Sequence, residues 1–284
     1  MPKHIAFIGL GAMGFPMAKR LCQAGFHLDI VLHRHRQPVE ELVGMGATLV
    51  DSVATACRNA DVIISILPSD KEMAEVLLNA DVRGSVRPGT ILLEMTSGTP
   101  NMMAKVEDVY VDLGCHVLDA PVSGGTIGAA NGSLTVMAGG NQEIIDKLSS
   151  IFDVLAKQVF TVGQVGDGKA IKAINQMLAG VHMVAASEAI RLAQHLHIDM
   201  ERLKDVVAAS SGASWMFLNK IDTVLARNFE PGFKLDLMKK DIRIALDEGK
   251  QIPLPITGLV HELYQLMSSQ NGDEDFSVIS TLAP

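Results

Sequence analysis

The stretch Ile5-Ala6-Phe7-Ile8-Gly9-Leu10-Gly11-Ala12-Met13-Gly14 decides the fold of this chain. Four apolar residues predict a buried parallel strand, and glycines at positions 9, 11 and 14 follow it at the start of a helical pattern. In such a strand–turn–helix unit the first glycine makes the turn, the second lets the backbone approach a pyrophosphate, and the third lets the helix pack on the strand. We therefore expect a dinucleotide-binding loop, with a purely structural glycine turn as the alternative. Its cofactor-binding residues are Gly9, Leu10, Gly11, Ala12, Met13 and Gly14.

Outward from this loop, the first half of the chain alternates β-rich runs with helical stretches, which predicts a doubly wound parallel sheet. Strands are expected at residues 4–8, 27–32, 62–67, 90–95, 116–119, 134–138 and 159–162, and helices at 14–24, 38–45, 52–58, 71–78 and 101–113. Beyond residue 168 only helices are expected, at 169–197, 200–208, 215–226, 233–251 and 255–268. The prediction is an α/β domain over residues 1–163 and an all-α domain over residues 164–284, joined by a long helix.

The end of the second strand bears on cofactor choice. An NAD site carries an acidic residue about 20 positions past the glycine motif, which binds the ribose hydroxyls. This chain has Leu32-His33-Arg34-His35-Arg36 there, and Asp29 lies too early, inside the strand. Arg34 or Arg36 can pair with a 2′-phosphate, so we expect NADP, with NAD possible and His33 and Arg34 at the site. The alternative is a solvated basic turn.

Polar and small residues follow three later strands. Ligands bind at the carboxyl ends of strands in open parallel sheets, so Leu67, Pro68 and Thr96 are expected to line the cofactor. Thr96 is expected to bond a nicotinamide ribose, although Thr-Ser-Gly also suits an ordinary turn. Ser123-Gly124-Gly125 offers consecutive N–H groups and a hydroxyl to a small carboxylate, with an ordinary loop as the alternative.

Lys172 and Asn175 lie three residues apart on the long helix, and so on one face. Partial burial disfavours the charged form of a lysine, so such a side chain can exchange a proton near neutral pH. A solvated helix lysine is the ordinary alternative, and Lys169 is the nearest rival for the role. Lys240 is a further candidate for contact with cofactor or substrate, against the alternative of a charged solvent face.

Composition excludes several other classes of function. The chain has 24 Lys and Arg against 32 Asp and Glu, a net charge of −8, and only 4% aromatic residues, which argues against a nucleic acid partner. Its three cysteines form no CxxC pair, and its nine histidines include no HxxxH or other spacing that indicates a pair of metal ligands, so no metal site is expected. The sequence contains no GxSxG motif, so a serine hydrolase is disfavoured. No apolar run approaches the ~20 residues that span a bilayer, so we expect a soluble cytoplasmic protein with no membrane partner.

Taken together, the motifs resemble those of the β-hydroxyacid dehydrogenase family, which includes 3-hydroxyisobutyrate dehydrogenase, tartronate semialdehyde reductase and glyoxylate/succinic semialdehyde reductase. The resemblance covers nearly the whole chain. The matching stretches are Ile8–Ala18, Asp119–Gly125 and Gly166-Asp167-Gly168, followed by Lys172, Asn175, Phe233 and Lys240-Asp241. The chain departs mildly at Glu94 and Thr96, where Asp and Ser are frequent.

The resemblance implies a Rossmann domain followed by a helical domain of 6-phosphogluconate dehydrogenase type, and a homodimer or homotetramer. It implies an NAD(P)-dependent enzyme that interconverts a small β-hydroxy acid and its semialdehyde. Lys172 would be the catalytic acid and base, and Asn175 would help to place the carboxylate substrate. The substrate would be bound by Ser123, Gly124, Gly125, Phe233 and Asp241, and the cofactor by Lys240 together with the loops named above. The alternatives are an imine reductase, a class that usually lacks the lysine, and a non-catalytic dinucleotide-binding protein.

Overall fold

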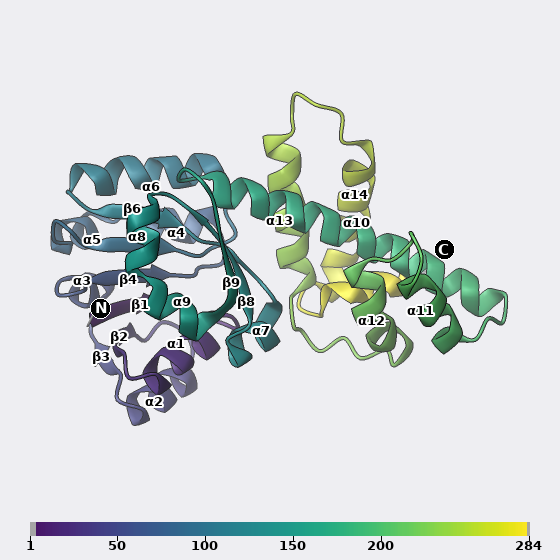
Figure 1. Ribbon diagram of the computed structural model, residues 1–284, viewed down its shortest axis with the longest axis horizontal. Coiled ribbons are helices and arrows are strands. Elements are labelled where there is room, and N and C mark those ends of the chain that lie inside the picture. Colours follow the sequence, from purple (N-terminus) through teal and green to yellow (C-terminus); the bar gives the residue numbers. More distant parts are fainter. Residues whose placement is uncertain (1–3, 283–284) are drawn as a thin grey trace. The chain divides into compact units, whose positions relative to one another are not determined.

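The computed structural model describes residues 4–282, which divide into two compact units, Met1–Lys172 and Ala173–Pro284. The division falls inside the long helix α10 (Asp167–His195). The boundary expected from the sequence, between residues 163 and 164, coincides with the end of the last strand, where the chain leaves the sheet. An α/β unit followed by a helical unit is the predicted fold class (Figure 1).

The first unit is built on one sheet. Its strands are β1 (His4–Ile8), β2 (His27–Val31), β3 (Thr48–Val50), β4 (Val62–Ser65), β5 (Ile91–Glu94), β6 (His116–Asp119), β7 (Val122–Ser123), β8 (Leu134–Gly139) and β9 (Ala156–Gly163). Their order is β3-β2-β1-β4-β5-β6-β8-β7, and β9 pairs with β8. The pairs from β3 to β6 are parallel, as predicted, whereas β8 runs antiparallel to β6 and β7. The strand order reverses between β1 and β4, which is where such sheets bind nucleotides.

Helices cover both faces of this sheet. One face packs against α1 (Gly14–Gln23), α2 (Arg36–Gly44), α7 (Gly125–Asn131), α8 (Gln142–Lys147) and α9 (Ser149–Leu155). The other packs against α3 (Val53–Cys57), α4 (Asp70–Leu77), α5 (Ala80–Ser85) and α6 (Pro100–Asp112). Alternation along β1 explains the two layers, because Ile5 and Phe7 join the first core and Ala6 and Ile8 the second.

The sequence pattern missed the short elements. Strands β3 and β7 have three and two residues, and helices α5, α7, α8 and α9 have six or seven. Hydrophobic periodicity identifies segments of this length poorly, although the five-residue helix α3 was predicted, within residues 52–58. The longer elements agree with the prediction to within a few residues at their ends.

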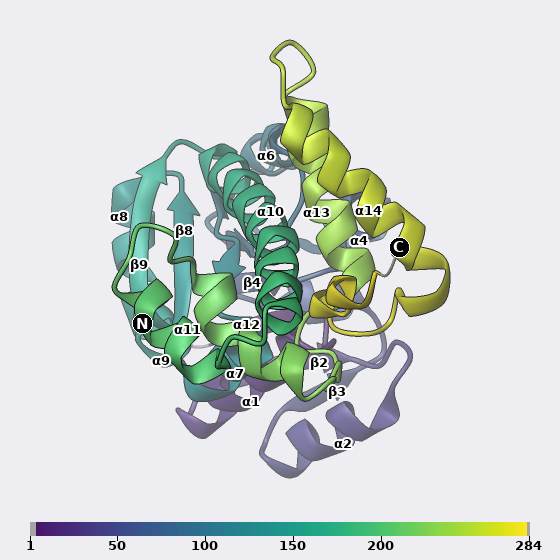
Figure 2. The same cartoon turned by 90° about the vertical axis from the view of Figure 1, so that its right-hand side faces the viewer.

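The second unit is helical in the part that is described. It contains the rest of α10, α11 (Met200–Ala208), α12 (Trp215–Leu225), α13 (Leu235–Glu248), α14 (Pro255–Asn271) and the short 3₁₀ helix η1 (Phe276–Thr281). At ~1.5 Å per residue, the 29 residues of α10 span about 43 Å. Figure 2 shows α13 and α14 side by side, and their buried faces share one core with α10 and η1. Across residues 4–282, no helix combines the length and the apolar character needed to cross a membrane.

Asp275 joins three parts of the second unit. Its carboxylate accepts hydrogen bonds from Lys220 Nζ at 2.9 Å, from the Ser277 backbone at 3.1 Å, and from the backbone N–H groups of Gly232 and Phe233 at 3.2 Å. Burial raises the pKa of Asp275, but the hydrogen bonds from Lys220 and Ser277 outweigh it, so the pKa lies below its usual range. The ionised form therefore stabilises the fold.

Replacing Asp275 by Asn should lower the free energy of unfolding at pH 7 by about 3 kcal/mol, because Lys220 loses a buried partner. A pKa lowered by folding contributes stability above the unfolded value of about 3.9 and loses it as the pH falls through the folded value. The difference between wild type and variant should therefore shrink below about pH 4 in urea unfolding. Asp273→Asn, at an exposed position whose side chain pairs with Lys234, is the matched control and should change little. Equal differences at pH 7 and pH 3 would contradict this role for Asp275.

Candidate functional site

The glycine loop after β1 is tightly packed on one side and open on the other. Gly9 has a φ of +101°, and a Cβ there would lie 2.1 Å from the Ile66 carbonyl oxygen. A Cβ on Gly14 would lie 1.8 Å from the Gly9 carbonyl oxygen, so no other residue fits at either position. At Gly11 a Cβ would meet no described atom within 4 Å. The protein itself does not require glycine at position 11, which fits a ligand that approaches the backbone there.

The N-terminus of α1 is suited to an anion. No side chain caps it, and its first turn contains no acidic residue. The Phe15 N–H already donates to the Gly11 carbonyl oxygen at 2.9 Å, and Pro16 has no N–H. The Gly14 N–H and the positive end of the helix dipole remain for a phosphate. Of the other predicted loop residues, Ala12 is exposed, whereas Leu10 and Met13 are partly packed against the core. These observations together fit the pyrophosphate of a dinucleotide.

The basic turn after β2 is exposed from residue 32 to residue 37. Arg36 begins α2, and its Nη1 lies 3.7 Å from Oε1 of Glu40, four residues along the helix. Arg34 forms no ion pair with any of residues 4–282. The pKa of Glu72 lies below its usual value, mainly because Ser69 donates a hydrogen bond to it, and the charges of Lys71 and Arg34 add smaller contributions. His33 is exposed beside it. Arg34 is therefore the arginine of this turn that is left for a 2′-phosphate.

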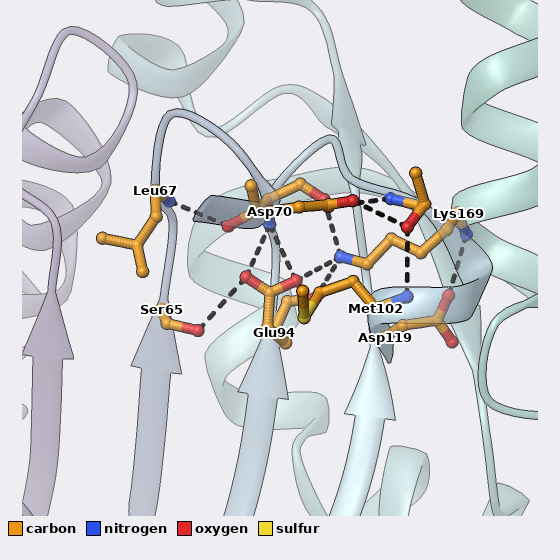
Figure 3. A network of polar contacts seen from close by, with 9 residues as sticks. Ser65, Leu67, Asp70, Glu94, Met102, Asp119 and Lys169 are labelled. Carbon is orange, nitrogen blue, oxygen red and sulfur yellow. Dashed lines mark hydrogen bonds and ion pairs between the residues drawn. The ribbon is translucent and has the colours of Figure 1, made fainter. Parts of the chain in front are cut away.

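A buried ion pair lies beyond the carboxyl end of β5 (Figure 3). The side chains of Lys169 and Glu94 are both 0% exposed, and Lys169 Nζ donates to the Glu94 carboxylate. The same ammonium group donates to the Thr96 carbonyl oxygen at 2.6 Å and to the Glu94 carbonyl oxygen at 3.4 Å. The Thr96 backbone N–H donates to the carboxylate at 3.1 Å. Both charges thus have several hydrogen bonds, which a buried pair needs to offset its loss of hydration.

Asp119, at the end of β6, fixes the same turn of α10. Its Oδ2 accepts the Lys169 backbone N–H at 2.8 Å. Burial raises the pKa of Asp119, while the positive charge of Lys169 and the backbone hydrogen bonds oppose the rise. A Cβ on Gly168 would lie 2.4 Å from the Met137 carbonyl oxygen, so the helix begins in direct contact with β8. The first turn of α10 is therefore held to the sheet by both main chain and side chain.

The ion pair distinguishes the two lysines that are candidates for the acid and base. Lys169 is committed to a buried ion pair, whereas Lys172 lies one turn later on α10 and is 7% exposed. A lysine with such a buried counter-ion is poorly suited to exchange protons with a substrate. The geometry therefore favours Lys172 as the acid and base, and Asn175 follows three residues later on the same face.

Thr96 connects the two loops that were predicted to line the cofactor. It is 1% exposed, and its Oγ1 accepts the Leu67 backbone N–H at 2.8 Å. The Thr96 hydroxyl keeps its hydrogen and a second lone pair, so it can still donate to or accept from a ribose hydroxyl. Leu67 is half-buried and Pro68 is exposed at the end of β4. The bond between Thr96 and a ribose stays a prediction, and the structure adds a supporting role that the sequence did not indicate.

The predicted carboxylate-binding residues lie in the short connection between β7 and α7. Ser123 ends the strand and is half-buried, Gly124 is exposed, and Gly125 begins the helix. A Cβ on Gly124 would lie 3.2 Å from Leu134 Cδ2, whereas one on Gly125 would meet nothing within 4 Å. Gly125 thus resembles Gly11 in leaving its backbone open to a ligand.

The predicted residues of the second unit form a separate network. Asn175 Nδ2 donates to Gln176 Oε1 at 3.1 Å, and Gln176 Nε2 donates to Asp241 Oδ2 at 2.8 Å. Lys240 Nζ lies 3.0 Å from Asp241 Oδ1, and Asp241 is 1% exposed. Asp241 therefore orients Gln176 and Lys240. Phe233 packs edge-on against Phe276 at 6.1 Å, which makes it part of the apolar core on that side.

Sequence reasoning missed two features of the site and one cluster that lies outside it. It noted Glu94 only as a departure from the family and Lys169 only as a rival lysine, because their contact joins residues 75 apart. It missed Gln176, although this residue lies one position after Asn175. It also predicted no metal ligands, whereas the structure brings His4, His27 and Asp29 together.

The stability of the protein is predicted to depend strongly on both members of the ion pair, Glu94 and Lys169. Glu94→Gln or Lys169→Met should each lower the free energy of unfolding by about 3–5 kcal/mol, since each leaves a buried group without its partner. The double variant Glu94→Met, Lys169→Met should recover much of that loss, as measured by urea unfolding. Lys71→Met, which removes an exposed pair with Glu75 at 3.9 Å, is the control and should have little effect. Additive losses in the double variant would rule out the ion pair as the cause.

Known proteins resemble the chain over its whole length. The family model for the NAD binding domain of 6-phosphogluconate dehydrogenase matches residues 4–163, and the model for the NAD-binding domain of NADP-dependent 3-hydroxyisobutyrate dehydrogenase matches residues 166–282. An NAD-dependent L-serine dehydrogenase of Pseudomonas aeruginosa is 35% identical, over 99% of this chain and 97% of its own. A 2-hydroxy-3-oxopropionate reductase of Escherichia coli is 32% identical, over 95% and 93%.

The fold agrees as well. The solved structure of 3-hydroxyisobutyrate dehydrogenase from Mycobacterium tuberculosis with L-serine superposes with a TM-score of 0.91 at 28% identity, covering 99% of both chains. The family models, the curated relatives and the solved structure therefore agree with the family indicated by the sequence motifs. The chain belongs to the β-hydroxyacid dehydrogenase family of NAD(P)-dependent oxidoreductases.

Proposed function

We propose that this protein interconverts a small β-hydroxy acid and its semialdehyde, with NADP(H) preferred over NAD(H) and Lys172 as the proton carrier. The observation that carries the proposal is the buried Lys172, one turn after a helix start that Glu94 and Asp119 hold in place. The names of the relatives support the substrate class. L-serine and 2-hydroxy-3-oxopropionate both combine a carboxylate with a hydroxyl or carbonyl group on the β-carbon.

The cofactor would be held by residues of the first unit. The loop from Gly9 to Gly14 and the N-terminus of α1 bind the pyrophosphate, and Arg34 binds the 2′-phosphate with His33 beside it. Leu67, Pro68 and Thr96 line the nicotinamide side, and the family resemblance implies a further cofactor contact from Lys240. When bound, the nicotinamide supplies the acceptor and donor of the hydride.

The chain's own residues would position the substrate and move one proton. Ser123, Gly124 and Gly125 bind the carboxylate through a hydroxyl and backbone N–H groups, which fixes the orientation of the β-carbon. Lys172 Nζ accepts the hydroxyl proton in oxidation and returns it to the carbonyl oxygen in reduction. Asn175 would bond the same oxygen. Within the second unit, Asp241 orients Gln176 and Lys240. Phe233 supplies an apolar boundary.

Two other functions are disfavoured by particular residues. An imine reductase usually lacks the lysine, and here Lys172 is present and buried. A non-catalytic dinucleotide-binding protein has no use for the combination of Lys172, Asn175 and Ser123. The proposal includes a homodimer or homotetramer, as the resemblance implies, and the cytoplasm as its location, as expected from the sequence.

The direct test is a substrate panel assayed with NADPH and with NADH. It contains succinic semialdehyde, glyoxylate, 2-hydroxy-3-oxopropionate and methylmalonate semialdehyde, with propanal and a cyclic imine as controls. At least one semialdehyde should be reduced, with kcat/KM about 10²-fold above that for propanal, because propanal lacks the carboxylate bound by Ser123 and its neighbours. Turnover of the cyclic imine alone would contradict the proposal and indicate an imine reductase. Tight NADPH binding without any turnover would favour the non-catalytic reading.

Cofactor preference is predicted to depend on Arg34. Arg34→Ala should raise KM for NADPH by about 10- to 100-fold, since a charge-assisted hydrogen bond to phosphate contributes about 1.5–3 kcal/mol. KM for NADH should stay unchanged, because NADH has no 2′-phosphate. Arg36→Ala is the matched control two residues along the chain, and its side chain already lies against Glu40. An equal effect of Arg34→Ala on both cofactors would contradict the assignment.

A further inference from the structure

We propose that His4, His27 and Asp29 form a binding site for one divalent transition-metal ion, with Zn²⁺ as the best-suited ion. The three side chains lie on β1 and β2, and their ligand atoms are all within 4.8 Å of one another. None of them belongs to the dehydrogenase site described above. The proposal is therefore independent of the proposed function.

Strand register brings the three residues to one place. In the parallel pairing of β1 with β2, His4 lies directly opposite His27, and Ala6 lies opposite Asp29. Side chains two residues apart on a strand share a face, so His4, His27 and Asp29 all project from the same side of the sheet. The small side chain of Ala6 leaves room beside Asp29. The cluster thus follows from the backbone pairing as well as from side-chain conformation.

The distances suit a metal that prefers nitrogen and oxygen ligands. His4 Nε2 lies 2.9 Å from Asp29 Oδ2, and His27 Nε2 lies 3.6 Å from Asp29 Oδ1. Zn–N and Zn–O bonds of about 2.0–2.1 Å at tetrahedral angles place neighbouring ligand atoms about 3.3 Å apart. The two rings meet edge to face at 4.7 Å, so both can turn a nitrogen toward the carboxylate. Small rotations would bring all three ligands to one ion.

The burial of the Asp29 carboxylate favours the binding of a cation at this cluster. Asp29 is only 7% exposed, and a buried carboxylate needs a positive charge or strong hydrogen bonds. His4 Nε2 is buried and close to this carboxylate, yet it forms no hydrogen bond with any described residue. A metal ion would satisfy both groups at once. The His27 side chain is 49% exposed, so solvent water can supply the fourth ligand.

The site lies away from the reaction. His4 begins β1 and the glycine loop follows its far end, so five residues at about 3.3 Å each, or roughly 16 Å, separate His4 from Gly9. A metal that bridges β1 and β2 would stabilise the strand pairing on which the cofactor loop is built. We expect it to change stability and leave turnover unchanged.

The test uses tag-free protein that has been treated with chelator and then titrated with Zn²⁺. Saturating Zn²⁺ should raise the melting temperature by about 5 °C, and Co²⁺ should give visible absorption bands at one ion per chain. Both signals should be lost in His27→Ala, whose exposed position makes the change easy to tolerate, and in Asp29→Asn. They should persist in His35→Ala, which removes an exposed histidine of the loop after β2.

Two results would overturn the site. One is the absence of any Zn²⁺-dependent rise in melting temperature of the wild-type protein. The other is a rise that survives both His27→Ala and Asp29→Asn, which would mean that Zn²⁺ binds elsewhere. Because melting temperature and cofactor turnover are measured separately, neither result depends on which substrate the enzyme uses.

Discussion

The buried ion pair between Lys169 and Glu94 is the constraint on which the proposed site depends. It holds two full charges out of water at the carboxyl end of β5, where parallel strands present their ligand-binding loops. Such a pair is costly unless its hydrogen bonds are complete, and here the Thr96 backbone supplies both a donor and an acceptor. The turn that contains Thr96 is therefore ordered by the same charges that attach α10 to the sheet.

From this constraint the position of Lys172 follows by helix geometry. Asp119 and the closely packed Gly168 fix the first turn of α10, and Lys172 is one turn further along. A rigid helix is a more exact support for the proposed proton carrier than a loop. In the second unit, Asp241 plays a comparable supporting role for Gln176 and Lys240. Both units thus contain buried carboxylates that orient longer polar side chains.

Much of this could be predicted from the sequence. The glycine motif after an apolar strand indicated the nucleotide-binding sheet, and apolar spacing beyond residue 168 indicated the helical unit, because both signals are local. The ion pair could not be predicted, since Lys169 and Glu94 are 75 residues apart and each has an ordinary local context. The pairing of His4 with His27 is set by strand register, which short-range spacing does not reveal. The sequence correctly placed Thr96 after the strand that ends at Glu94, but its bond to Leu67 depends on the neighbouring strand.

The central claim is that Lys169 holds helix α10 to the sheet through its ion pair, whereas Lys172, on the same helix, carries the proton. The most direct measurement compares Lys172→Met and Lys169→Met in kcat, in the dissociation constant for NADPH and in melting temperature. The account predicts that Lys172→Met lowers kcat by about 10²- to 10⁴-fold while melting temperature and NADPH binding are unchanged. Lys169→Met should lower the melting temperature and, because Asp119 and Gly168 still hold the first turn of α10, should lower kcat far less than Lys172→Met does. A Lys172→Met variant with near-normal kcat, or a fully stable Lys169→Met variant that has lost activity, would contradict it.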